Sequence, residues 1–172
     1  MIERTRKKLR EAAFFLSHLQ REVGVSTPAS PVETIEFYLS AFLSAARSVT
    51  TVLQSEAPAV YPAWSPGWRA SLTVPERELL AEFTDARNRA LKRETPVLSE
   101  EWRPLQPGLH RLPRIPAELV FFFGEEAAAP SEGRVVVGRL TPEAARGEVL
   151  PLCNQYFDIL SRLVSTFEQA HG

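Results

Sequence analysis

The segment FTDARNRALKRE, residues 83–94, contains three side chains that together could bind an anion: Arg87, Asn88 and Lys92. If the segment is helical, Asn88 and Lys92 lie four residues apart on one face, and Arg87 lies one step of about 100° from Asn88. All three side chains then point into one wedge of about 140°. Arginine offers a planar fork of N–H donors, asparagine a neutral donor and acceptor, and lysine a compact positive charge. The spacing therefore predicts an anion-binding site.

A purely structural role would explain the same residues. Arg87 could pair with Glu82, with Asp85 or with an acidic residue of a neighbouring helix, and Asn88 could cap or bridge helices. Exposed ion pairs of this kind are common and contribute only about 0–1 kcal/mol to stability. Both interpretations stay open, because the sequence alone does not say what lies beside Arg87.

Familiar catalytic and metal-binding patterns are missing from the sequence. It has no GxxxxGK[ST] phosphate loop, no GxGxxG turn, no HExxH zinc motif, no CxxC pair and no GxSxG elbow. The histidines, His18, His110 and His171, are not spaced like metal ligands. Cys153 falls in an apolar row of the last expected helix, where a cysteine ordinarily serves packing. We therefore expect no metal and no cofactor.

Composition indicates a protein without a general affinity for polyanions. The chain has 172 residues, and 20 Lys and Arg against 21 Asp and Glu give a net charge of -1. Nucleic-acid binding would then need a local patch, since no global positive field is present. The single cysteine and the lack of an apolar signal core near the N-terminus favour a cytoplasmic location. Arg47 and several hydroxyls interrupt the most apolar run, residues 37–54, so we expect no membrane span.

Four segments have apolar residues at alternating spacings of three and four. They predict amphipathic helices over residues 4–22, 31–54, 74–93 and 148–170 of a single domain, residues 1–172. The sequence Thr73-Val74-Pro75-Glu76 is a helix-start pattern with a capping box. The last helix carries two apolar rows, and this width predicts a homodimer interface.

The segments between these helices look different. Residues 55–71 are rich in proline and aromatic residues, which predicts an irregular connection whose Trp64 and Trp68 fold back onto the helices. Residues 95–116 contain five prolines and are expected to be extended over the surface. The runs LVFFFG and RVVVGRL predict a β-hairpin within residues 118–139. The expected fold is mainly α, a four-helix bundle with a small β-hairpin inserted before the last helix.

The chain also resembles a known superfamily over most of its length. The segments PVETIEFYLSAFLSAARSVTTVLQ and EFTDARNRALKRE, and within them SAFLSAARSVT and FTDARN, resemble the HEPN-like helical-bundle proteins of bacteria. In that superfamily an Arg-Asn pair followed by a histidine, in an R-x(4-6)-H pattern, forms a metal-independent ribonuclease site, commonly across a homodimer. The resemblance places the arginine at Arg87, the asparagine at Asn88 and the histidine position at Lys92.

Lysine at the histidine position changes the expected chemistry. Histidine titrates near neutral pH and can move protons during RNA cleavage, whereas a free lysine has a pKa of about 10.4. We therefore expect a non-catalytic or degenerate HEPN-like dimer in which Arg87, Asn88 and Lys92 bind an anionic group such as RNA or a nucleotide. Two alternatives are a protein-protein interaction module of a toxin-associated or regulatory system, and a metal-independent ribonuclease in which Lys92 replaces the histidine.

Overall fold

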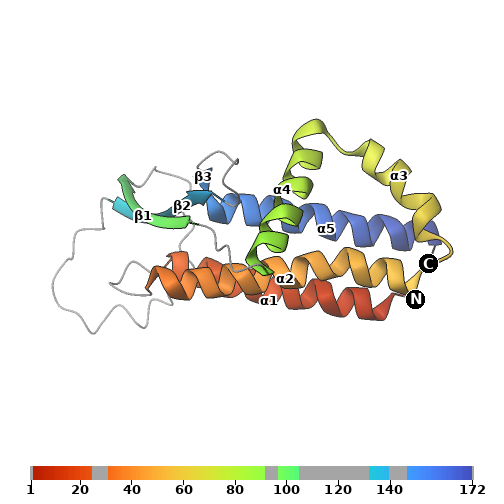
Figure 1. Cartoon of the computed structure of the whole chain (residues 1–172), viewed down its shortest axis with the longest axis horizontal. Coiled ribbons are helices and arrows are strands. Elements are labelled where there is room, and N and C mark those ends of the chain that lie inside the picture. The colour runs from red at the N-terminus through yellow and green to blue at the C-terminus, as the bar shows by residue number, and fades with distance from the viewer. Residues whose placement is uncertain (1, 25–30, 92–96, 105–131, 140–146, 172) are drawn as a thin grey trace, which may run out of the picture.

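The computed structural model describes residues 2–24, 31–91, 97–104, 132–139 and 147–171. Its elements, in chain order, are α1 (Glu3–Gly24), α2 (Val32–Glu56), α3 (Tyr61–Ser71), α4 (Val74–Leu91), β1 (Val97–Pro104), β2 (Glu132–Arg139), β3 (Gly147–Glu148) and α5 (Val149–His171). The described residues are mainly helical and form a bundle (Figure 1). None of the described helices is long and apolar enough to cross a membrane.

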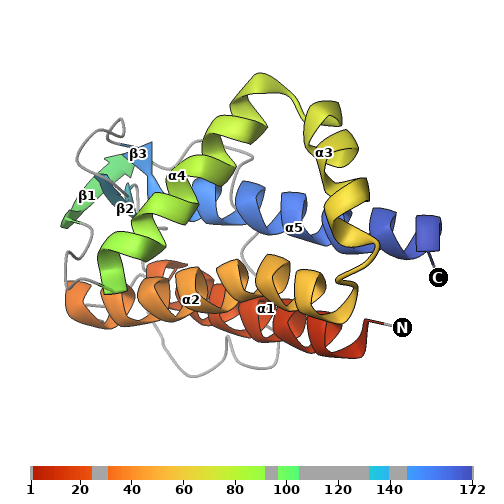
Figure 2. The ribbon, with the colours of Figure 1, turned by 45° about the vertical axis from the view of Figure 1, so that its right-hand side comes forward.

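The three longest helices lie side by side, and α1 runs antiparallel to α2 and α5 (Figure 1). The start of α1 and the end of α5 lie at one end of this layer, and the strands lie at the other. α3 and α4 cross over the layer and meet at an angle (Figure 2). Because α4 contacts both α2 and α5, it joins these two helices on one side of the bundle.

The apolar rows that the sequence predicts form the core. α5 buries both of its rows inside one chain: Cys153, Leu160, Val164 and Phe167 from the first, and Tyr156, Ile159 and Leu163 from the second. Contacts within the chain therefore account for the apolar width of α5. The second row packs against neighbouring helices of the same chain, so the apolar width of α5 does not by itself argue for a homodimer, which stays a prediction.

Carboxylates satisfy the first backbone N–H groups of two helices. The N–H groups of Arg4 and Thr5 donate to the carboxylate of Glu56 at 2.9 and 2.7 Å, and the Thr5 hydroxyl donates to it at 2.6 Å. The last residue of α2 thus caps the start of α1. At the start of α4, the N–H and hydroxyl of Thr73 donate to Glu76 at 2.8 and 2.9 Å. The predicted capping box is therefore present.

α3 was not expected, since residues 55–71 were predicted to be an irregular connection. Pro62 lies in the first turn, where a backbone N–H has no acceptor within the helix, so this proline is compatible with α3. Aromatic rings stabilise the helix: Trp64 packs edge-on against Phe167 of α5 at 5.0 Å between ring centroids, and within α3 it stacks with Trp68 at 6.1 Å. The prediction that Trp64 and Trp68 fold back onto the helices is confirmed.

The sheet differs from the predicted hairpin. β2 contains the RVVVGR run, but its antiparallel partner is β1, with Val97 opposite Arg139 and Pro104 opposite Glu132. β3 pairs with the end of β2, which gives the strand order β1-β2-β3. Residues 97–104 are extended, as expected for this part of residues 95–116, but their pairing as a regular strand was not expected. The only proline inside this stretch is its last residue, so a paired edge strand is possible there. The other expected strand, LVFFFG, lies outside the described residues.

Candidate functional site

Two residues of the predicted anion site lie near the end of α4. The Arg87 guanidinium donates through Nη1 to Oδ1 of Asn88 at 3.3 Å. The Nε atom of Arg87 is buried and has no hydrogen-bond partner among the described residues. Asn88 is exposed. Lys92, the third predicted member, lies outside the described residues, so the structure brings together only Arg87 and Asn88.

The acidic residues closest in sequence do not neutralise Arg87. Glu82 and Asp85 lie on the same helix, yet neither forms an ion pair with Arg87 in the part of the chain that the structure describes. Burial raises the pKa of Glu82, which is the expected effect of desolvating a carboxylate without a cationic partner. The structural alternative, in which Arg87 pairs with Glu82 or Asp85, is thus not observed.

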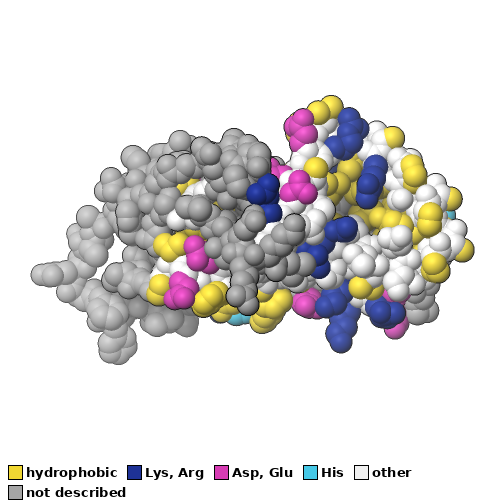
Figure 3. All heavy atoms as spheres, in the orientation of Figure 1, with side chains coloured by type: hydrophobic (Ala, Val, Ile, Leu, Met, Phe, Trp, Pro, Cys, Tyr) yellow, Lys and Arg dark blue, Asp and Glu magenta, His cyan; other side chains and the backbone are white. Residues whose placement is uncertain are grey.

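A cleft lined by three arginines was missed by sequence reasoning. It lies between α2, α3 and α4, has a volume of about 450 Å³, and includes Arg47, Arg69 and Arg77 in its lining. We call it the arginine cleft. On the face seen in Figure 3, Lys and Arg side chains gather around hydrophobic side chains where α3 and α4 cross the bundle. Among the described residues that line the cleft, Asp85 is the only acidic one.

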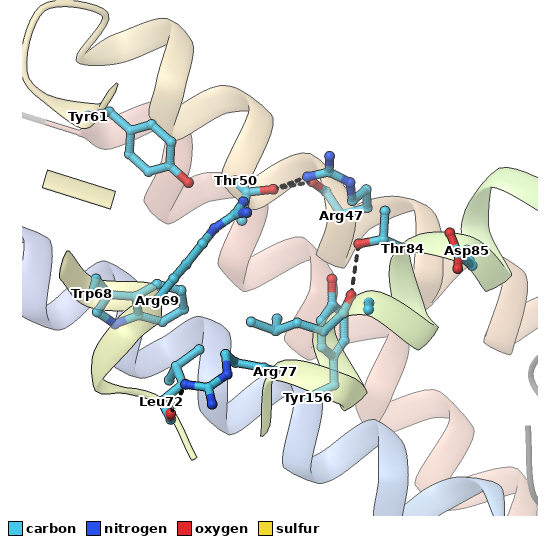
Figure 4. A pocket seen from close by; sticks show the side chains of 12 residues that line it. Arg47, Thr50, Tyr61, Trp68, Arg69, Leu72, Arg77, Thr84, Asp85 and Tyr156 are labelled. Atoms are coloured by element: carbon cyan, nitrogen blue, oxygen red, sulfur yellow. Dashed lines mark hydrogen bonds between the residues drawn. The ribbon is translucent and has the colours of Figure 1, made fainter. Parts of the chain in front are cut away.

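Each arginine comes from a different helix, and their contacts leave much of each guanidinium available. Arg47 on α2 donates to the hydroxyl of Thr50, one turn along. Arg77 on α4 donates to the backbone carbonyl of Leu72 at 2.7 Å. Arg69 extends from α3 toward Thr50 (Figure 4) and has no ion pair with any described residue. Both partners that do accept, a hydroxyl and a carbonyl, are neutral, so no ion pair with a described residue cancels these positive charges.

The remaining lining is aromatic, aliphatic and hydroxylated. Tyr156 of α5 lies at the bottom of the cleft, and burial raises the pKa of its hydroxyl to about 12, although the charge of Arg47 opposes this shift. The hydroxyl is therefore protonated at neutral pH and able to donate. Tyr61 and Trp68 of α3 contribute buried rings. The arrangement combines positive charge, hydroxyl donors and apolar surface, as small-molecule sites commonly do.

Little in the sequence predicts this cleft. Arg47 attracts notice only as a charge within the apolar run of α2, Arg69 belongs to the segment expected to be irregular, and Arg77 is one residue past the capping box. Without α3 in place, nothing brings these residues together. The one usable signal is Arg47, because a charged residue on a largely apolar helix needs either a partner or a solvent-filled opening.

The described histidines pack against aromatic rings, and the cysteine is buried. His18 stacks on Tyr38 at 5.0 Å between ring centroids, and His171 contacts Phe167 at 4.9 Å, while His110 lies outside the described residues. Cys153 is buried, and burial raises the pKa of its thiol far above its ordinary value, so the reactive thiolate is disfavoured. Within the described ranges, no group of three His, Cys, Asp or Glu side chains could hold a metal ion.

Comparisons with known proteins identify no relative. No protein-family model, no curated protein and no solved structure matches the chain. The functional argument therefore depends on the residues and geometry described above.

Proposed function

We propose that the protein is a non-catalytic, HEPN-like helical bundle that binds an anionic group, such as RNA or a nucleotide, through Arg87, Asn88 and Lys92. The observation that carries this proposal is the absence of an ion pair between Arg87 and its helix neighbours Glu82 and Asp85. A guanidinium that is not neutralised by its own helix keeps its charge for a ligand.

The hydrogen bonding of Arg87 supports the same conclusion. A buried N–H without an acceptor costs about 1–3 kcal/mol. The Nε atom of Arg87 is buried and has no acceptor among the described residues. A phosphate oxygen, together with a change of the Arg87 rotamer, would supply the acceptor. Asn88 already accepts from Arg87 and lies exposed beside it, so its amide N–H group remains free to donate to a second phosphate oxygen.

The expectation that the site binds without cleaving rests on Lys92. A lysine would need its pKa lowered by about three units to act as a general base at neutral pH. Binding makes no such demand, because a charged lysine attracts phosphate directly. The positive charges of Arg87 and Lys92 thus favour binding over catalysis.

We further propose that the protein acts as a cytoplasmic homodimer. Phe14 of α1 and Phe37 of α2 are 56% and 64% exposed, and a second copy would remove this apolar surface from water. Light scattering should then return a mass near 38.6 kDa, which is twice the 19.3 kDa of one chain. A mass of 19.3 kDa at every practical concentration would refute the dimer.

Binding of a short single-stranded RNA at two salt concentrations tests the proposed function. We expect Arg87→Ala to weaken binding and to make the slope of log K against log salt shallower by about 0.7, the value for one lost phosphate contact on a single strand. Arg10→Ala, which removes an exposed arginine from α1, serves as the charge-matched control and should leave the slope unchanged. No RNA binding, or binding indifferent to Arg87, would overturn the proposal and favour a protein partner for this surface.

A further inference from the structure

We propose that the arginine cleft is a second binding site, separate from Arg87 and Asn88, for a small phosphate monoester that carries a planar apolar ring. Arg87 does not line the cleft, which is bordered on α4 by residues from Arg77 to Asp85. The inference therefore goes beyond the proposed function and does not depend on it.

The charge of the cleft matches a phosphate dianion. Three arginines and one aspartate are the charged residues of its described lining, and three positive charges with one negative charge give a net charge of +2. A phosphate monoester carries a charge of about -1.5 to -2 at pH 7. Three like charges around one small cavity repel each other, and a bound dianion would reverse the sign of that interaction.

The arginines also have the donors that phosphate recognition needs. A guanidinium has five N–H donors in a planar fork, which suits two phosphate oxygens at once. The hydroxyl of Thr50 and the carbonyl of Leu72 engage only part of Arg47 and Arg77. Arg69 reaches over the cleft from α3. Guanidinium groups from three helices therefore line one cleft, and in the proposed complex they would turn toward its phosphate.

The apolar part of the lining indicates the body of the ligand. Trp68 and Tyr61 present aromatic rings, and Leu72 and Leu80 add aliphatic surface. A volume of about 450 Å³ is within the range of small-molecule sites, about 300–1,000 Å³. Apolar surface next to a phosphate-binding group favours a ligand whose phosphate is attached to a ring, because inorganic phosphate would leave this surface in contact with water.

Isothermal titration calorimetry of the full chain with phenyl phosphate tests the assignment. We expect binding that Arg69→Gln or Arg77→Gln weakens about tenfold or more, which corresponds to about 1.4 kcal/mol. Both arginines are exposed, so thermal unfolding of the variants should stay close to that of the wild type. Arg10→Gln, which changes an exposed arginine of α1 that belongs to neither site, is the charge-matched control and should leave the affinity for phenyl phosphate unchanged.

Two further ligands separate the contributions of phosphate and ring. Inorganic phosphate should bind more weakly than phenyl phosphate, and equal affinities would refute the role of the apolar lining. In the Arg87→Ala variant, which removes an arginine of the other site, adenosine monophosphate should bind more tightly than glucose 6-phosphate, and the reverse order would refute the planar ring. Failure of all four compounds to bind would overturn the site in the arginine cleft. It would not bear on the RNA-binding proposal, which the Arg87→Ala experiment tests separately.

Discussion

Phe83 of α4 stacks on Tyr156 of α5, with ring centroids 4.2 Å apart and planes inclined by 22°. Phe42 of α2 meets both rings edge-on, at 6.4 and 6.3 Å between centroids. This aromatic cluster holds three helices together at one point. Because Tyr156 also lines the arginine cleft, the cluster connects the hydrophobic core to the bottom of the cleft.

Truncation of Phe83 should therefore strongly destabilise the protein. The side chain is 1% exposed, and removing such a phenylalanine leaves a cavity as well as losing burial, so we expect Phe83→Ala to lower the free energy of unfolding by about 3–5 kcal/mol. Urea unfolding followed by circular dichroism measures this change. Val74→Ala, at a position 56% exposed on α4, is the control and should change stability by less than about 0.5 kcal/mol. Equal effects of the two substitutions would contradict the core position of Phe83.

Glu56→Gln should destabilise the protein at neutral pH. Burial alone would raise the pKa of Glu56, but hydrogen bonds from Thr5 and from the backbone of Arg4 outweigh it, and the pKa lies below its ordinary value. A glutamine would turn an N–H group toward these donors, and the loss of a helix cap costs about 1 kcal/mol. Urea unfolding at pH 7 should show this loss, while Glu78→Gln on exposed α4 surface should not.

The effect of Glu56→Gln should also depend on pH. Since the pKa of Glu56 is lower in the folded state, its contribution is fully present above the unfolded pKa, about 4.3, and is lost as pH falls through the folded pKa. The wild type and the variant should therefore converge in stability at acidic pH. A difference between them that stays constant from pH 7 to pH 3 would show that the carboxylate charge is not involved.

Glu82→Gln should stabilise the protein at neutral pH, which is the opposite of the effect expected for Glu56→Gln. Burial raises the pKa of Glu82 in the folded state, so folding favours its protonated form and stability falls as pH rises through the pKa. A neutral glutamine removes this penalty, and the variant should be more stable than the wild type at pH 7, by an amount that shrinks toward pH 4. Thermal unfolding at the two pH values measures this. A less stable variant at pH 7 would imply that Glu82 has a cationic partner.

The wild-type protein should bind RNA without cutting it. Incubation of the protein with mixed-sequence RNA should yield no cyclic-phosphate ends at pH 7, because the histidine position of the HEPN-like pattern is Lys92. End-labelled RNA on denaturing gels measures cleavage. Cyclic-phosphate ends that appear with the wild type and disappear in Lys92→Ala would establish the ribonuclease alternative in place of the non-catalytic one.

The sequence by itself determined the helical frame of this protein. Apolar residues at alternating spacings of three and four are a local signal, because the period of a helix repeats within a few residues. The capping box of Thr73 and Glu76 is local in the same sense, and both were predicted from neighbouring residues. The pair Arg87 and Asn88 could be found in the same way, since adjacent positions on one helix stay close whatever surrounds them.

The tertiary structure decided everything that depends on distant residues. α3 forms where Trp64 can pack on Phe167, more than a hundred residues away in sequence, and only then do Arg69 and Arg47 line the same cleft. β1 pairs with β2 between residues that are far apart in the sequence, so no local pattern predicts this pairing. The arginine cleft exists because three helices meet there, and the convergence of three separate charges is a property of the packed fold, which no single segment encodes.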